Sequence, residues 1–560
     1  MIQPILDAIL LAQSDPSQIP AMSQVAVTVE QLDDSQVDQL IEQLSDFADE
    51  LHDAVPDLPP QSPLPRSRMD QILQPIIFQL ANRESRRVPA NSSKATRGTT
   101  EATEQASADL AKLSSTAPPR EDWSVSRLQS IETLYRLTPA HSDLRNHLLR
   151  WLATARRPAT LDLWQALVCH DPPQHRLGIV LAFAPLMQAG AAPSLGLLKS
   201  LLEHATAYSQ IAPAVFDLCN YYFRTGQIAT HPAAERAGHL ANLLGELIQQ
   251  MIQVEDGDFP KNLEAWQINQ LVSDSVALIV SLCDTFALLQ HASAIAKLHQ
   301  ALSLRHRRVQ TEAAAALARL GDETGKQALI ALAEQPISRL RVLAYADELN
   351  FKHEISLELQ GEIAIAESHL AIWLSEPDQM GLAPSSIELI DHREMNWPSY
   401  DHPVQCYLFR YAYGVGESAH SNIGICGPLT QAFAADLQHL PIDEIYAAFA
   451  GWQTTHPEIF QMSSAKAQQA FPNEMRRLTA ALNDGDLVDT KIHAVGSFFG
   501  ERVLIASAKS ENQAGTIIVD SHDSTWYEMG NPAAPIDWKL AYAIWRGKQL
   551  LAEFNPNETA

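Results

Sequence analysis

The sequence predicts a multidomain protein in which an α-solenoid of paired helices is followed by an α+β domain with a mainly antiparallel sheet. Three observations predict this fold class. The chain has 560 residues, which is enough for two or three separate cores. From about 123 to 350, apolar residues fall three or four apart and recur at the spacing of a helix pair. From about 380 the apolar period becomes two, which is typical of strands.

Composition and charge indicate the class of partner. Hydrophobic residues make up 46% and charged residues 19% of the chain, as in globular proteins. The net charge is −26, and residues 1–65 hold twelve Asp or Glu and no Lys or Arg. This acidic balance argues against nucleic acid or an anionic membrane as the partner, because phosphate contacts need clustered cations. We also expect no membrane span and no secretory signal, since no apolar run is long enough and no basic start precedes the N-terminal apolar stretch.

Cysteine usage indicates the compartment. The five cysteines are odd in number and widely spaced, and no C-x-x-C motif occurs. This pattern does not fit a disulfide framework or a zinc site, so we expect a protein of the reducing cytoplasm.

The N-terminal segment, 1–57, is predicted to be acidic and helical. A helix is expected within 27–54, with Ser35 and Asp38 as its capping signal. Its apolar stripe consists of Val37, Leu40, Ile41, Leu44, Phe47 and Leu51. The acidic opposite face has two interpretations: a solvated face of a docked helix, or a recognition surface for a basic partner.

Residues 58–122 are predicted to be a largely disordered linker. The stretch 55–68 is rich in proline, and 84–120 is rich in Ser, Thr and Ala with almost no large apolar residues. Such a composition cannot bury enough apolar surface to order the chain.

Helix pairs recur through the predicted solenoid, 123–375. At an offset of 34 residues, six apolar positions of one pair fall on six apolar positions of the next. The first set is Trp164, Leu167, Val168, Leu177, Leu181 and Ala184, and the second is Leu198, Leu201, Leu202, Ile211, Val215 and Leu218. At an offset of 33, the matches are Arg308-Val309 with Arg341-Val342, and Ala313 with Ala346. Because one pair cannot bury its apolar face alone, we expect neighbouring pairs to stack and to form a concave surface.

The stretch from about 295 to 350 resembles the HEAT family, in particular the phycobilisome-lyase-type repeats. One helix opens with an Arg-Val pair, continues through alanines and ends in the turn Leu320-Gly321-Asp322, as in those repeats. The resemblance implies HEAT-like helix pairs that serve as a scaffold or binding surface. A few members of that family handle a tetrapyrrole, but 295–350 has no Cys or aromatic cluster to support this activity.

The C-terminal α+β domain is predicted over 380–555. Alternation predicts strands over 404–414 and 491–509, the second folded into two strands at a type II′ turn of Gly500-Glu501, and a last strand over 515–529. The aromatic face of 404–414 suits a sheet core or, alternatively, a ligand-stacking surface. Helices are expected after Pro428, with Leu429, Phe433, Leu437 and Leu440 as the buried stripe, and also over 441–452 and 536–554.

Cys426 is the candidate for chemistry. It lies between glycines, and we expect it at a helix N-terminus, where the partial positive charge favours a thiolate. Downstream strands carry His493, and Asp520 with His522, which would point to one face of a strand as orienting acid and base. The alternatives are a structural strand-to-helix turn and a redox-sensitive thiol.

This order of a Cys at a helix start and strands with His and Asp resembles papain-like cysteine peptidases. The Asp-Ser-His strand end resembles the viral tegument deubiquitinases of that clan. The resemblance implies Cys426 as nucleophile, His522 or His493 as base and Asp520 as orienting acid. The sequence departs from the papain pattern because no Gln or Trp flanks Cys426 and because Pro428 lacks a donor N–H.

The sequence therefore favours a non-enzymatic, cytoplasmic scaffold or interaction protein whose partner is another protein. The alternative function is that of a cysteine hydrolase in the C-terminal domain. We expect no cofactor and no metal: no Walker loop occurs, and the pairs Asp391-His392 and Asp401-His402 do not fix two imidazoles on one element.

Overall fold

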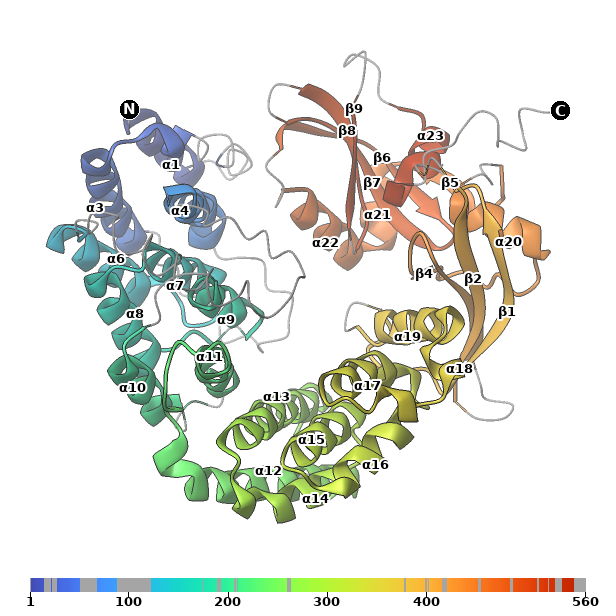
Figure 1. Cartoon of the computed structure of the whole chain (residues 1–560). Helices are drawn as coiled ribbons and strands as arrows, with labels where there is room; N and C mark the ends of the chain where they lie inside the picture. The colour runs from blue at the N-terminus through green and yellow to red at the C-terminus, as the bar shows by residue number, and fades with distance from the viewer. Residues whose placement is uncertain are drawn as a thin grey trace. The chain divides into compact units, whose positions relative to one another are not determined.

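The computed structural model confirms the predicted fold class: helices that pack in pairs come first, and two antiparallel sheets follow. It describes residues 2–14, 22, 28–50, 68–87, 122–174, 176–188, 193–205, 208, 210–258, 263–376, 379–397, 400, 402–414, 420–451, 455–483, 487–510, 513–521, 523–528 and 536–547. Among these residues, seventeen α-helices precede the first strand (Figure 1). Two compact units, Met1–Arg305 and His306–Ala560, make up the chain.

The first unit is helical throughout its described part. Its α-helices are α1 (Gln3–Ser14), α3 (Asp34–Glu50), α4 (Arg68–Arg87), α6 (Val125–Leu137), α7 (Asp143–Ala155), α8 (Pro158–His170), α9 (Arg176–Phe183), α10 (Leu195–Ala205), α11 (Ala212–Arg224), α12 (Ala237–Glu255), α13 (Ala265–Leu289) and α14 (Ile295–Leu302). Helix α3 packs on α6, α4 on α7, α7 on α9, and both α11 and α12 on α13. These contacts bury the apolar stripes that the periodicity predicts.

The repeat at an offset of 34 residues is matched in burial at three of its five described pairs, and the half-buried Ala184 and the exposed Leu181 differ from their buried equivalents Leu218 and Val215. Trp164 and its equivalent Leu198 are both fully buried, as the repeat predicts. Leu181, however, is 42% exposed, whereas its equivalent Val215 is fully buried. The side chain of Leu177 lies outside the described residues.

Helix α3 confirms the predicted N-terminal helix, but its cap differs from the prediction. The backbone N–H of Gln36 donates to Asp33 Oδ1 at 2.8 Å, and the backbone N–H of Asp33 donates to Gln36 Oε1 at 3.0 Å. This reciprocal pair is a capping box, and it replaces the predicted Ser35–Asp38 signal. Asp38 instead binds the guanidinium of Arg127 on α6. The acidic face therefore pairs in part with the body of the first unit.

Helix α4 lies within the predicted linker and differs from that prediction. Its apolar residues are spaced three or four apart and are buried: Ile72, Leu73, Ile76, Ile77 and Leu80. Glu84, which is 2% exposed, binds Arg157 at 3.0 Å and so fixes α4 to the start of α8. The short apolar stripe is enough to form a docked helix, because α7 covers it. Residues 88–121 of the predicted linker lie outside the described residues.

One helix differs from the prediction that no segment could cross a bilayer. The stretch Gln267–Leu289 of α13 is long and apolar enough to do so by length and composition. More than half of its apolar window, 56%, is buried against the protein. A buried core helix passes the same test, so this single helix is weak evidence for a membrane span.

The second unit joins five helices to both sheets. The helices are α15 (Arg307–Arg319), α16 (Glu323–Leu332), α17 (Pro336–Glu348), α18 (Leu357–Gln360) and α19 (Glu362–Leu374). The first sheet has the order β1 (Ser386–Met395), β2 (Val404–Tyr413), β3 (His420–Cys426) and β4 (Gln431–Ala432). The second has the order β5 (Ile459–Met462), β6 (Val488–Phe498), β7 (Glu501–Ser510), β8 (Gln513–Val519) and β9 (Ser524–Glu528). Further helices are α20 (Ile442–Ala450), α21 (Ser464–Ala470), α22 (Pro472–Asn483), α23 (Trp538–Ile544) and the 3-10 turn η8 (Trp545–Gly547).

A buried arginine holds α19 to the preceding helices. Arg339 of α17 is 3% exposed, and its guanidinium donates to the carbonyl oxygens of Ala333 at 2.8 Å and Ala364 at 2.7 Å. It also binds the Glu367 carboxylate at 2.6 Å. The charge is thus paired and its N–H groups have acceptors, as a buried guanidinium requires.

The second sheet corrects three predictions. The hairpin loop of β6 and β7 consists of Phe499 and Gly500, with φ angles of 47° and 83°, so it is a type I′ turn and not the predicted type II′ turn at Gly500-Glu501. Residues 515–529, predicted as one strand, form β8 and β9 with a turn after Val519. The predicted helix over 536–554 is described only as α23 and η8.

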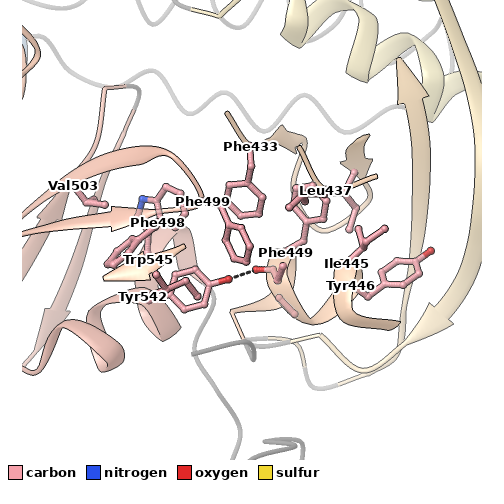
Figure 2. Packing of buried hydrophobic residues seen from close by; sticks show 14 of the residues in the cluster. Phe433, Leu437, Ile445, Tyr446, Phe449, Phe498, Phe499, Val503, Tyr542 and Trp545 are labelled. Atoms are coloured by element: carbon pink, nitrogen blue, oxygen red, sulfur yellow. Dashed lines mark hydrogen bonds between the residues drawn. The ribbon is translucent and has the colours of Figure 1, made fainter. Parts of the chain in front are cut away.

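An aromatic core lies between the two sheets (Figure 2). The ring centroid of Phe433 lies 4.8 Å from that of Phe449 on α20 and 5.0 Å from that of Phe499. The fully buried Tyr542 on α23 donates its hydroxyl hydrogen to the Ala448 carbonyl. Phe499 has a positive φ because its ring fills this core, which explains a bulky residue at a turn position that glycine usually occupies.

A buried histidine connects the ends of α11 and α13 in the first unit. His231 is 2% exposed; its Nδ1 accepts from the backbone N–H of Ala233 at 3.1 Å, and its Nε2 lies 3.0 Å from Asn220 Oδ1. Asn220 also accepts from Thr285 and donates to the Ser281 carbonyl. Since Nδ1 acts as an acceptor, the imidazole is neutral, and burial lowers its pKa from 6.5 to about 4.

We expect the stability of the first unit to fall as the pH is lowered from about 6.5 to 4. In this window the unfolded chain protonates His231 and the folded chain does not, so unfolding is favoured, by up to roughly 3 kcal/mol. Urea unfolding of the wild type and of His231→Asn at several pH values measures this difference. The matched control is His239→Gln, since His239 is an exposed histidine on α12 of the same unit. An unchanged pH slope in His231→Asn would contradict the assignment.

Candidate functional site

The chain turns from β3 to β4 directly after Cys426, so the predicted helix after Pro428 is wrong. Gly424 pairs with Ala432 and Ile425 with Gln431 in an antiparallel register, and no helix follows until Ile442. The apolar residues that were expected to form the buried stripe of this helix do not lie on a helix. Phe433 and Leu437, which both lie in the loop after β4, are buried in the core between the sheets. Cys426 is therefore not at a helix N-terminus, and the thiolate-stabilising dipole predicted there does not exist.

The two glycines that flank Cys426 have packing reasons. A Cβ at Gly424 would lie 2.8 Å from Leu370 Cδ1, so the missing side chain lets α19 approach β3. Gly427 has a φ of 149°, and a Cβ there would lie 2.4 Å from the carbonyl oxygen of Gln405 on β2. Both distances are shorter than real Cβ contacts. At Gly427 the close neighbour is backbone, so glycine is needed there, whereas at Gly424 the close neighbour is the end of the Leu370 side chain, which would have to shift.

Cys426 faces α19 and is 5% exposed. It packs in a cluster with Leu370 and Leu374 of α19 and with Tyr407 and Phe409 of β2. Its Sγ lies 3.4 Å from Thr430 Oγ1. Burial raises the pKa of the thiol, although the bonds from Thr430 and the Gly427 backbone partly oppose this. A raised pKa keeps the sulfur protonated, which is the opposite of an activated nucleophile.

His493 lies in the second sheet, on β6. Its Nε2 is 2.8 Å from Ser507 Oγ on the neighbouring strand β7. Burial, and then the charge of Lys491, lower the pKa of its imidazole. The ring is thus neutral at pH 7 and forms a cross-strand contact.

Asp520 follows the end of β8 and binds the C-terminal segment of the described chain. It is 1% exposed; its Oδ2 accepts from Trp545 Nε1 at 2.7 Å and from Arg546 Nε at 2.6 Å. Its Oδ1 accepts from the backbone N–H of Asp523 at 2.7 Å, which closes the turn into β9. Arg546 also binds Glu501 at 2.8 Å. This buried cluster ties η8 to the tips of β7 and β8.

The structure brings no two of Cys426, His493 and Asp520, the described members of the predicted catalytic set, into contact. No hydrogen bond connects Cys426, His493 and Asp520 in the part of the chain that is described, and each has the other partners given above. Because Asp520 lies in a turn, the argument that it shares a strand face with His522 is wrong. His522 itself lies outside the described residues. The catalytic assignment stays a prediction without a supporting contact.

Sequence reasoning missed the cluster around Asp520. Its members, Glu501, Asp520, Trp545 and Arg546, come from three separate segments. The local signal was present, since an Asp-Ser-His-Asp stretch is typical of a turn in which a carboxylate caps the backbone. Nothing in the sequence indicates that Arg546, 26 residues away, is the partner.

Metal ligands do not gather in the described part of the chain. No group of three or more His, Cys, Asp or Glu side chains there could hold an ion. Asp391, from the pair considered above, binds Arg393 at 2.7 Å. Asp401 lies outside the described residues.

Comparison with known proteins finds no match: no protein-family model fits the chain, and no curated protein is significantly similar to it.

Replacing Gly424 by Ala is expected to lower the free energy of unfolding by about 1–3 kcal/mol, because the added methyl group presses on Leu370. Urea denaturation measures the effect. Gly238→Ala is the matched control, since a Cβ there meets nothing within 4 Å. The double variant Gly424→Ala/Leu370→Ala should lose less stability than the sum of the two single variants, and strict additivity would contradict the contact.

Cys426 is expected to react slowly with iodoacetamide in the folded protein, with an apparent pKa above the ordinary 9.0, because burial disfavours the thiolate. Mass spectrometry of the alkylated peptide across pH values measures the rate. Cys219, whose pKa burial raises to about 12, is the internal reference for an inert thiol. Alkylation of Cys426 at pH 7 faster than that of free cysteine would revive the nucleophile interpretation.

Proposed function

We propose that this chain is a protein–protein interaction or scaffold protein that binds a partner protein through the surface of its HEAT-like helix pairs. The proposal is non-enzymatic and places the protein in the cytoplasm. The net charge of −26 supports a protein partner over nucleic acid or an anionic membrane. The described cysteines are buried and form no disulfide, which is consistent with a reducing compartment.

The observation that carries the proposal is the exposure of apolar side chains on α9. Leu181 is 42% exposed at a position where the matched residue of the next pair, Val215, is fully buried. Val180 beside it is 67% exposed. The position that is buried in the next helix pair, at Val215, is therefore exposed to solvent in this pair, at Leu181. Contiguous exposed apolar side chains mark contact surfaces on soluble proteins, so this neighbouring pair supports a contact with another protein at α9.

The matched positions of the second unit support the HEAT-like assignment. Val309 on α15 and its equivalent Val342 on α17 are both fully buried, and so are Ala313 and Ala346. The alanines allow the helices to approach closely. A Cβ at Gly325 on α16 would lie 2.5 Å from the backbone nitrogen of Ala318 on α15. The same residue types thus serve the same packing role one repeat apart.

The cysteine-hydrolase alternative has less support. It needs a thiolate near an imidazole, whereas burial raises the pKa of Cys426 and its neighbours are α19 and the first sheet. No described contact favours it over the interaction function.

The double variant Val180→Asp/Leu181→Asp is expected to reduce partner recovery at least tenfold when the tagged full chain is purified from its native cells. Charged residues cannot be buried unpaired in an apolar contact. Quantitative mass spectrometry of co-purified proteins measures the loss. Val125→Asp is the matched control, because Val125 is equally exposed, at 70%, on α6.

Two outcomes would overturn the proposal. The first is that no protein co-purifies reproducibly with the wild-type chain. The second is that the α9 double variant and the Val125→Asp control recover the same partners in the same amounts while both remain folded by circular dichroism.

A further inference from the structure

Two histidines of the first unit lie together at equivalent positions of successive helix pairs. His170 is the last residue of α8, and His204 lies in the last turn of α10, 34 residues later. This is the offset at which the helix pairs recur in the sequence. Helices α8 and α10 are in contact, and the centroids of the two imidazole rings are 5.3 Å apart. The packing of neighbouring helix pairs therefore brings the two rings together.

The hydrogen bond of His204 fixes which of its nitrogens can bind a ligand. Its Nδ1 lies 2.8 Å from the carbonyl oxygen of Ser200. A carbonyl oxygen can only accept, so Nδ1 carries the hydrogen and the lone pair of the neutral ring is on Nε2. Histidines that bind a metal ion are commonly oriented in this way, with one ring nitrogen donating to a carbonyl and the other binding the ion.

His170 supplies a second imidazole that has no competing polar partner. Its side chain is exposed, and it forms no hydrogen bond or ion pair with any residue that the structure describes. Its contact with His204 is edge-to-face, with 83° between the ring planes. Two imidazoles that share a tetrahedral ion at about 2.0–2.1 Å have ring centroids roughly 5 Å apart. The observed separation therefore fits a shared ion as well as an aromatic contact.

The neighbouring side chains indicate the class of ion and the rest of its shell. Imidazole nitrogens suit zinc, copper and nickel, whereas calcium and magnesium take oxygen ligands. Glu203, the carboxylate next to His204, already binds Arg236 at 2.8 Å. The protein therefore offers two ligands at this place, fewer than the three or more of a closed site, and water completes the shell. The net charge of −26 favours the accumulation of cations at the protein surface.

We propose that His170 and His204 form a surface site for a divalent transition-metal ion of the zinc and copper class. Nε2 of His204 and one ring nitrogen of His170 bind the ion, and water molecules occupy its remaining positions. A structural zinc site, by contrast, surrounds the ion with four protein ligands. The proposal goes beyond the proposed interaction function and does not rest on it.

Isothermal titration calorimetry of the full chain with Zn²⁺, after treatment with a chelator, tests the site. We expect the wild type to bind one equivalent of Zn²⁺ that His204→Gln binds at least tenfold more weakly, because one imidazole remains. His170→Phe should show the same loss but keep its thermal stability, since phenylalanine preserves an edge-to-face ring contact. His239→Gln removes an exposed histidine of α12, is the matched control and should bind like the wild type.

Electron paramagnetic resonance with one equivalent of Cu²⁺ identifies the ligands directly. We expect nitrogen splittings from two imidazoles in the wild type and from one imidazole in His170→Phe. If the wild type binds no Zn²⁺, or if both variants bind it as tightly as the wild type, the pair is an aromatic contact only and the proposal is overturned. An equal loss of binding in His239→Gln would also overturn it, because the ion would then be shared among surface histidines.

Discussion

The contact of α19 with the first sheet, at Leu370 and Gly424 among other residues, joins the helix pairs of the second unit to its sheets. It brings α19 onto β3, while Arg339 holds the same helix to α17 and to the turn before it. Helix α19 thus belongs to two layers, the helix pairs and the first sheet. A side chain at position 424 would press on Leu370 and force its side chain to shift. Cys426 is buried by the same contact, so its environment follows from packing.

The apolar periodicity of the sequence predicted those helices and strands that pack against a segment nearby in the sequence or against the next repeat. Helix pairs such as α15 and α16, and hairpins such as β6 and β7, were predicted from spacing alone, because adjacent segments bury each other's apolar residues. The same reasoning failed after Cys426. Phe433 and Leu437 have helical spacing, but their burial comes from the core between the sheets, with Phe499 and Trp545 as distant partners. Tertiary packing therefore overrode a helical pattern.

The candidate site was least predictable where its contacts span long sequence distances. The types of residue, a Cys, a His and an Asp, suggested chemistry, but only the structure shows that Asp520 binds Trp545 and Arg546. A buried carboxylate needs paired donors, and this cluster supplies them. Its members hold the end of the described chain against the tips of β7 and β8. Asp520 is therefore explained by its structural role in holding Trp545 and Arg546, and no local sequence motif indicates that role.

In the first unit, ion pairs between helices help to dock the acidic N-terminal segment. The N-terminal segment is acidic, yet Asp34 and Asp38 of α3 bind Arg83 and Arg127, so part of this charge is used to dock the helix. Where the protein needs a charge for its own stability, it supplies the counter-charge from a neighbouring helix.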